Sequence, residues 1–318
     1  MRELVGTARE WVAEGRTGFL ARAVTEQGFG PRVPGGAVLV DPEGGCAGSL
    51  YRGVFDAQLV AEAAAVPAGD TARVCEVSVH GAEAEAAGLT CGGQAEVLLQ
   101  PLESVPEEWW RLLGEGAGAA LVSRLDEAGR QVTSSVVRPG REPGSEAERR
   151  ALELLGHHRA GRDALCGEAD TGLVLIEALP ADPFLVIGGG GELAELITAQ
   201  ARLLGWSAVT TVDGAEASGL LGAGRGSECL VMLSHDPSFD VPVLRGALTG
   251  GVPYVGALGS RKTQARRRDG LLGTGVTEEQ VSRVHGPIGL DLGARTPAET
   301  AMAICAEILS TLTAGDVE

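Results

Sequence analysis

The feature that most constrains this sequence is a run of four glycines directly after a short apolar segment. Residues 183–187 (Pro-Phe-Leu-Val-Ile) are typical of a buried parallel strand, and the glycine run follows at 188–191. Apolar residues then recur at helical spacing over 193–204. Within this strand–turn–helix, Gly189, Gly191 and Ala194 fit the G-x-G-x-x-A pattern of dinucleotide-binding domains.

Asp213 strengthens this interpretation, because it follows the next predicted strand and lies 22 positions after Gly191. Glycines allow a tight turn and leave room for a pyrophosphate to approach the helix N-terminus. An acid at this place accepts a hydrogen bond from a ribose hydroxyl and repels a 2′-phosphate, which favours NAD. Two alternatives stay open, because Glu192 puts a carboxylate where phosphate would approach. One is a domain of this shape that binds no nucleotide, and the other is a different phosphate-bearing ligand.

The rest of the C-terminal half repeats the alternation of strand and helix. Strands are expected at 208–212, 229–233 and 252–258, and a last helix begins after Thr296. Thr296 with Glu299 forms a predicted capping box. This order predicts an α/β fold in which residues 182–318 form a Rossmann-like, doubly wound parallel sheet.

Residues before 182 are expected to form smaller α/β modules, which we divide into 1–113 and 114–181, the second including the linker. The basis is a degenerate internal repeat. Each copy has an opening strand, a helix and a closing strand, at 18–24, 54–65 and 94–102 in the first copy and at 118–124, 146–159 and 171–179 in the second.

The overall charge excludes several classes of partner. The formal net charge is −17, which repels phosphate backbones and anionic membranes, so neither nucleic acid nor a membrane is expected as a partner. Six cysteines occur without C-x-x-C spacing, and we expect no metal site. The first thirty residues lack an apolar leader segment, and no apolar run approaches 18 residues. We therefore expect a soluble, cytoplasmic protein.

Polar side chains follow two of the predicted strands at their carboxyl ends. His235 and Asp236 follow the strand at 229–233, and Ser260 and Arg261 follow the strand at 252–258. Ligands bind at this edge in open α/β sheets. His235 can exchange a proton near neutral pH with Asp236 orienting it, and Arg261 offers a bidentate fork for phosphate. The alternative is that His235 and Asp236 belong only to a surface turn.

A glycine- and proline-rich loop follows at 286–293 and is expected to form the rim of a pocket. His285 and Asp291 are candidate catalytic side chains of this rim, and Arg295 is a candidate cofactor ligand. The alternative for Asp291 and Arg295 is that they pair with each other.

Three strings in this half carry a family resemblance: Ser-His-Asp at 234–236, Tyr-Val-Gly-Ala-Leu-Gly-Ser-Arg-Lys at 254–262 and the segment His-Gly-Pro-Ile-Gly-Leu-Asp-Leu-Gly-Ala-Arg-Thr-Pro-Ala-Glu at 285–299. In this order they closely resemble the C-terminal domain of the XdhC/CoxI family. Its members are accessory factors that mature molybdenum hydroxylases such as xanthine dehydrogenase and carbon monoxide dehydrogenase.

The N-terminal part resembles the first domain of the same family, with one departure. Residues 30–36 are similar to its Pro-Arg-Pro-Pro-Gly turn, and residues 88–93 match its Gly-Leu-Thr-Cys-Gly-Gly segment, which makes Cys91 a candidate cofactor contact. The family's Gly-Ser-Val-Ser-Gly-Gly-Cys-Val-Glu stretch is altered at 48–56, where Val54 replaces the cysteine and Arg52 a glycine.

The resemblance implies a homodimeric carrier of the molybdenum cofactor with a molybdenum hydroxylase as its client. The cofactor would lie in the cleft between the domains. A second hypothesis is an NAD-dependent oxidoreductase of a small molecule on the same scaffold, with His235 or His285 as proton donor. A third is a nucleotide-sensing or scaffolding protein without catalysis. Five bases within 261–268, in an otherwise acidic chain, form a cluster that is expected to face one small phosphate-bearing ligand, with Arg261 as the phosphate contact. The three arginines at 266–268 point in different directions, so not all can face one ligand, and the alternative for most of them is a solvated helix face.

Overall fold

The computed structural model describes residues 1–28, 35–67, 69–81, 84, 92–157, 159–166, 172–224 and 226–314. The chain divides into two compact units, Met1–Pro180 and Ala181–Glu318. Each unit is described below by itself.

The first unit contains two antiparallel sheets. In the described residues, the first sheet has the strand order β3-β2-β1-β5-β4 and the second has the order β7-β6-β9-β8. The strands are β1 (Phe19–Gln27), β2 (Val38–Val40), β3 (Cys46–Gly48), β4 (Arg73–Val79), β5 (Gly93–Pro101), β6 (Ala119–Leu125), β7 (Val132–Val137), β8 (Gly161–Cys166) and β9 (Leu173–Leu179). The helices are η1 (Arg2–Leu4), α1 (Val5–Ala13), η2 (Tyr51–Gly53), α2 (Asp56–Ala64), η3 (Leu102–Ser104), α4 (Glu107–Gly114) and α5 (Glu146–Gly156).

The two sheets share one topology, as the internal repeat predicted. In each copy a hairpin (β1–β2 or β6–β7) is followed by a helix (α2 or α5) and by a second pair of strands (β4–β5 or β8–β9). The opening strand pairs with the closing strand in both copies, β1 with β5 and β6 with β9. Strands therefore lie where the repeat predicted its opening and closing strands, and the structure adds that these strands pair with each other. The division of this unit at 113/114 stays a prediction.

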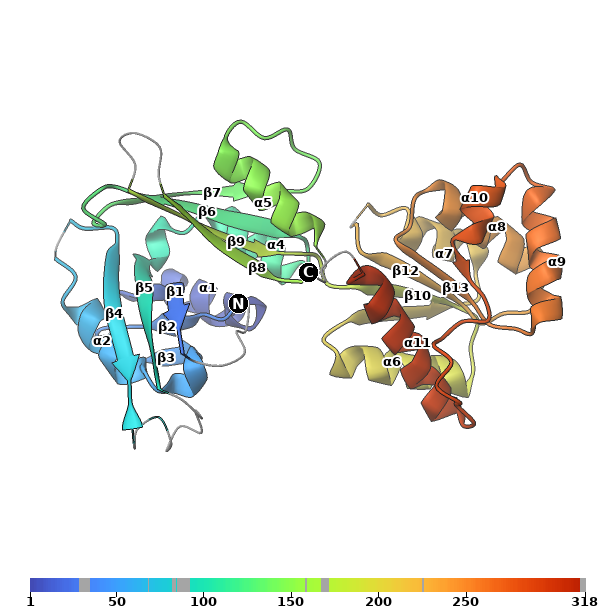
Figure 1. Cartoon of the computed structure of the whole chain (residues 1–318), viewed down its shortest axis with the longest axis horizontal. Helices are drawn as coiled ribbons and strands as arrows, with labels where there is room; N and C mark the ends of the chain where they lie inside the picture. The colour runs from blue at the N-terminus through green and yellow to red at the C-terminus, as the bar shows by residue number, and fades with distance from the viewer. Residues whose placement is uncertain are drawn as a thin grey trace. The chain divides into compact units, whose positions relative to one another are not determined.

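The sheets of the first unit pack face to face. Leu98 of β5 and Leu175 of β9 belong to one buried cluster between them. The alternate residues of these strands face away from the other sheet and are covered by helices. Phe55 and Leu59 of the α2 region cover the first sheet. Ala147 and Ala151 of α5 cover the second sheet. Figure 1 shows α5 lying across the strands of its sheet. This alternation follows from the period of two in a strand.

The second unit is the predicted Rossmann-like α/β domain. Its strands are β10 (Phe184–Gly188), β11 (Ser207–Thr211), β12 (Glu228–Met232), β13 (Tyr254–Ala257) and β14 (Val284–His285). They form a parallel sheet with the order β11-β10-β12-β13-β14 in the described residues. The order reverses between β10 and β12, which is the topological switch point where such sheets bind ligands. The doubly wound parallel sheet is thereby confirmed.

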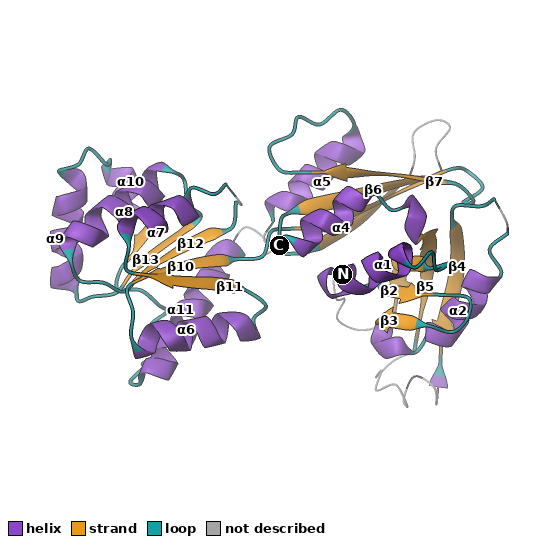
Figure 2. Ribbon diagram, turned by 180° about the vertical axis from the view of Figure 1, so that it is seen from behind, coloured by secondary structure: helices purple, strands orange, loops and turns teal. Residues whose placement is uncertain are grey.

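Helices cover both faces of this sheet (Figure 2). They are α6 (Glu192–Leu203), α7 (Gly214–Leu221), α8 (Pro237–Thr249), α9 (Arg261–Leu272), α10 (Glu278–Ser282) and α11 (Pro297–Leu312). Helices α6 and α11 bury Ile197 and Ile304 against one face, and α7 to α10 bury residues such as Leu244 and Leu271 against the other. The predicted capping box of Thr296 and Glu299 is present at the start of α11.

Candidate cofactor-binding site

The glycine loop connects β10 to α6 at the switch point and leaves the helix end open. Gly191 is the N-cap of α6, with φ 93° and ψ −175°, a conformation that only glycine adopts readily. No side chain of the described residues caps this end. A Cβ added at Gly190 or Gly191 would meet nothing within 4 Å. The first amides of α6 therefore face open space, as binding of an anion requires.

The other two positions of the motif have packing roles. Gly189 has φ 128°, and a Cβ there would lie 3.0 Å from the backbone nitrogen of Ser234. Ala194 is 2% exposed and belongs to the cluster under α6 that includes Leu185 of β10. Both positions require small residues, because the backbone of Ser234 lies against Gly189 and strand β10 lies against Ala194.

Three predicted ligand-binding side chains are the N-caps of the helices that follow their strands. Asp213 Oδ1 accepts from the backbone N–H groups of Ala215 at 2.7 Å and Glu216 at 3.0 Å, and so caps α7. Ser260 Oγ accepts from the Thr263 N–H at 3.3 Å and caps α9. Each cap fixes its side chain at the carboxyl edge of the sheet.

Asp236 is the third of these caps, at the start of α8. Its Oδ1 accepts from the backbone N–H and the hydroxyl of Ser238, at 2.9 and 2.7 Å. These hydrogen bonds hold the pKa of Asp236 below its usual value. The caps formed by Asp213 and Asp236 both use Oδ1, so Oδ2 is the oxygen of each that could meet a ligand.

His235, Arg261 and Lys262 are exposed at the same edge. His235 follows β12, and the two cations occupy the first turn of α9, after β13. In the described part of the chain, no hydrogen bond or ion pair engages these three side chains. The loops that carry them follow β12 and β13, the next two strands of the sheet after β10, so these side chains share the carboxyl edge with the open end of α6. Arg261 and Lys262 are thus cations on the same edge as the backbone amides that a phosphate would meet there.

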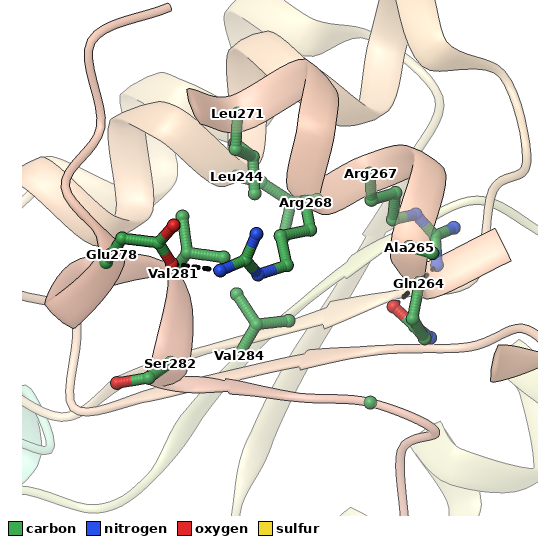
Figure 3. A pocket seen from close by; sticks show the side chains of 11 residues that line it. Leu244, Gln264, Ala265, Arg267, Arg268, Leu271, Glu278, Val281, Ser282 and Val284 are labelled. Atoms are coloured by element: carbon green, nitrogen blue, oxygen red, sulfur yellow. Dashed lines mark hydrogen bonds and ion pairs between the residues drawn. The ribbon is translucent and has the colours of Figure 1, made fainter. Parts of the chain in front are cut away.

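The basic segment 261–268 does not act as one cluster, which corrects the expectation from the sequence. Arg267 is buried and pairs with Asp240 at 2.7 Å. Arg268 pairs with Glu278 across a pocket of about 310 Å³ between α9, α10 and β14. Figure 3 shows the two arginines leaving α9 in different directions. Successive helical residues point about 100° apart, so one ligand cannot meet all of them.

His285 lies at the end of β14 in a side-chain cluster that the sequence did not reveal. Its ring stacks on Tyr254 with centroids 4.8 Å apart, and its Nδ1 lies 3.6 Å from Oε1 of Glu307 on α11. Glu307 Oε2 accepts from the Tyr254 hydroxyl at 2.6 Å and from the Gly289 N–H at 2.9 Å. Burial opposes ionisation of Glu307, but these partners and His285 hold its pKa below the usual value.

Glu307 is not among the site residues predicted from the sequence, because the most evident pattern of the last helix is its apolar stripe. The position is three residues after Ile304 and one before Ile308, so it lies beside the buried face. An acid at such a position is the signal that could have identified it.

Asp291 and Arg295 both lie in the exposed segment that leads into α11. The described residues show no ion pair between their side chains, so the alternative in which these two residues pair with each other is not observed. The Arg295 backbone N–H donates to Glu299 at 2.6 Å, within the cap of α11. Both charged groups are therefore accessible to a ligand or a partner.

The first unit differs from the second at its own candidate site. Cys91 and most of the 30–36 turn lie outside the described residues. In the altered 48–56 stretch, Tyr51 and Arg52 both have positive φ, 49° and 61°. Such values are uncommon for residues other than glycine, and the family has glycine at the second position.

Val54 brings no thiol to this stretch, and the thiol of Cys46 on β3 does not ionise easily. Burial and the charges of Asp56 and Asp41 raise the pKa of Cys46. The described residues contain no group of three or more His, Cys, Asp or Glu side chains suited to hold a metal ion.

The fold and this edge define a two-unit protein whose second unit is a Rossmann-type domain with an uncapped helix end at its switch point. Comparison with known protein families identifies the family to which this protein belongs. Residues 185–308 match the XdhC Rossmann domain, and residues 11–78 match the XdhC and CoxI family. The chain belongs to the XdhC and CoxI family.

Two curated proteins of Escherichia coli strain K12 are similar in sequence. The molybdenum cofactor insertion chaperone PaoD is 32% identical over 81 residues, or 26% of this chain and 26% of PaoD. The uncharacterized protein YqeB is 28% identical over 174 residues, or 48% of this chain and 31% of YqeB. The matches thus span less than a third of either relative's own length.

A crystal structure of a xanthine dehydrogenase from Bacillus halodurans has a similar fold. Its TM-score is 0.64 at 17% identity, covering 98% of this chain and 96% of that chain. Among the residues that the structure describes, no helix has both the length and the apolar character needed to span a bilayer.

Proposed function

We propose that this protein is an accessory factor of a molybdenum hydroxylase and carries the molybdenum cofactor, or a nucleotide form of it, as cargo. Membership in the XdhC and CoxI family supports this role. The similarity to PaoD, a molybdenum cofactor insertion chaperone, supports it further. On this proposal the protein is a homodimeric, cytoplasmic carrier without turnover.

The observation that carries the proposal is the open N-terminus of α6, which shares the carboxyl edge of the sheet with the exposed cations Arg261 and Lys262 of α9. The phosphate of the cargo fits there, because Gly190 and Gly191 leave space and no side chain of the described residues caps the helix. Amides of α6 would bind the phosphate, and Arg261 would hold two of its oxygens. The hydroxyl of Ser260 lies in the same turn.

The remaining candidate residues are assigned to the rest of the cargo. His235 and Asp236 would contact the pterin side. His285, Asp291 and Arg295 would form the other rim. Cys91 stays a candidate from the sequence that lies outside the described residues. Transfer of sulfur through Val54 is not part of the proposal, since this side chain has no thiol.

Lys262 makes the proposal directly testable, because it is the only lysine in the sequence. We expect saturating pyrophosphate or ADP to slow acetylation of Lys262 at least about fivefold, since a bound anion would cover it. Mass spectrometry measures the rate, and the Arg261→Ala variant should lose most of the protection. An unchanged rate at saturating ligand would argue against an anion site here.

Three measurements on the purified protein then identify the cargo. They are its absorption spectrum, its molybdenum content, and titrations with molybdenum cofactor, NAD and NADP. Tight binding of the molybdenum cofactor without NAD binding supports the carrier. Micromolar NAD binding without molybdopterin would exclude the carrier and favour the second candidate.

That second candidate is an NAD-dependent oxidoreductase of a small molecule. It is favoured by the G-x-G-x-x-A loop at 189–194 in its strand–helix context and by Asp213, whose Oδ2 is not used in the cap of α7. His235 or His285 would be the proton donor beside the nicotinamide.

A further inference from the structure

Arg267 joins three elements around the candidate site without reaching the open helix end itself. The residue is 6% exposed. Its Nε and Nη2 donate to Asp240 Oδ2 on α8, at 2.9 and 2.7 Å. Nη2 also donates to the carbonyl of Ser234 at 2.5 Å, and Nη1 donates to the carbonyl of Leu258. One guanidinium thus links the loop after β12 to the loop after β13.

Gln264 reinforces the second loop from the same helix. Its Nε2 donates to the carbonyls of Ala257 at 2.7 Å and Gly259 at 3.3 Å. Gly259 has φ 137°, and a Cβ there would lie 3.0 Å from Thr263 Cβ and 3.3 Å from Arg267 Nη1. Side chains of α9 therefore hold three successive carbonyls of the turn that presents Ser260 and Arg261.

Stability alone gives a weak reason for this arrangement. Asp240 Oδ1 is buried and has no hydrogen-bond partner in the described residues. A buried ion pair with an unsatisfied oxygen is often matched in stability by apolar side chains of similar size. The carbonyls that Arg267 holds supply a different reason, because a guanidinium can donate to several fixed acceptors at once.

We propose that Arg267 is a positioning residue, which sets the separation of the loops after β12 and β13 so that Arg261 and the open end of α6 meet the same phosphate. This inference rests on the proposed anion site. Arg267 itself does not touch the ligand, and Gln264 supports it.

The test is calorimetric titration of the full chain with ADP. Arg267→Lys keeps a positive charge beside Asp240 but loses the fork that reaches two carbonyls, so we expect binding about tenfold weaker. Arg268→Lys is the matched control, because it makes the same change one residue further on, in an exposed ion pair. We expect it to bind within about twofold of the wild type.

A double-mutant cycle separates positioning from a general structural effect. If Arg267 acts through Arg261, the Arg261→Ala/Arg267→Lys variant should bind about as weakly as Arg261→Ala alone. Independent structural damage would instead multiply the two losses. Multiplied losses, or wild-type affinity in Arg267→Lys, would overturn the inference.

Gln264→Ala keeps the test decisive if Arg267→Lys does not fold. It removes two hydrogen bonds to the same turn, and we expect binding about threefold weaker with a cooperative thermal transition retained. Wild-type affinity in this variant would then overturn the inference. Wild-type affinity in Arg261→Ala would have a different meaning, since that result would contradict the proposed anion site itself.

Discussion

Among the residues that the structure describes, each compact unit buries an arginine against a carboxylate, but the two arginines hold different partners. In the first unit, Arg22 of β1 donates to Glu177 at 2.7 Å and to Ser123 at 3.1 Å, and it also contacts Gln100. All four side chains are at most 1% exposed. They come from β1, β5, β6 and β9, so this arginine connects side chains of both sheets.

Arg267 in the second unit holds backbone carbonyls of two loops instead. A side-chain network between sheets fixes how the sheets pack, whereas bonds to loop carbonyls fix where the loops place their side chains. In this protein, therefore, the buried arginine of the first unit fixes how the sheets pack, and the buried arginine of the second unit positions the loops of the candidate site.

The largest expected effect tests the architectural half of this comparison. Burial alone would raise the pKa of Glu177, but the charges of Arg22 and Arg162 hold it below its usual value. Glu177→Ala leaves Arg22 buried and uncompensated, so we expect it to lower the free energy of unfolding by about 3–5 kcal/mol. Urea denaturation measures this loss of unfolding free energy, with tryptophan fluorescence as the signal. A Trp206→Phe background is used because its remaining tryptophans lie in the first unit.

The matched control is the apolar double variant Arg22→Met/Glu177→Leu, which should regain most of that stability because neither charge of the fully buried pair is left alone. Arg162, which also pairs with Glu177, keeps its ion pair with Glu26 at 3.8 Å. Affinity for ADP should stay within about twofold of wild type in Glu177→Ala. A loss of stability below about 1 kcal/mol would contradict the role of this pair in joining the sheets.

An intermediate effect is expected at the glycine loop of the second unit. Gly191→Ala forces a Cβ into φ 93°, ψ −175°, and we expect a loss of about 1–3 kcal/mol in unfolding free energy together with loss of ADP binding. Gly190→Ala is the control for stability, because its φ is not positive and the added Cβ meets nothing within 4 Å, although that Cβ would enter the space proposed for the phosphate. Equal losses of unfolding free energy in the two variants would show that strain at Gly191 is not the cause.

The smallest effect concerns Glu307, a carboxylate that is only partly buried. Its folded pKa lies below its unfolded value, near 4.5, so its stabilisation is present above that pH and is lost as pH falls through the folded pKa. Denaturation of wild type and Glu307→Gln should therefore differ more at about pH 5.5 than at about pH 3. A difference that grows toward pH 3 would reverse the sign and contradict this assignment.

Much of the fold could be predicted from local patterns. The strand at 183–187 with its glycine turn, and the capping box at Thr296, were both found where the sequence put them. The repeat of opening and closing strands also held, because alternation of apolar residues is a local property. The interpretation of 261–268 as one cationic cluster was wrong, since the partners of Arg267 and Arg268 lie on other elements.

The sequence by itself determined the class of fold, the family and the edge of the sheet on which polar residues gather. Those conclusions rest on residue order, periodicity and motif, which need no knowledge of distant contacts. Only the tertiary structure decided which charges are available. It buried Arg267 against Asp240 and placed Glu307 beside His285, but left Arg261 and Lys262 exposed. The reason is physical: a charge is free or neutralised according to its neighbours in space, and these neighbours lie up to tens of residues away along the chain.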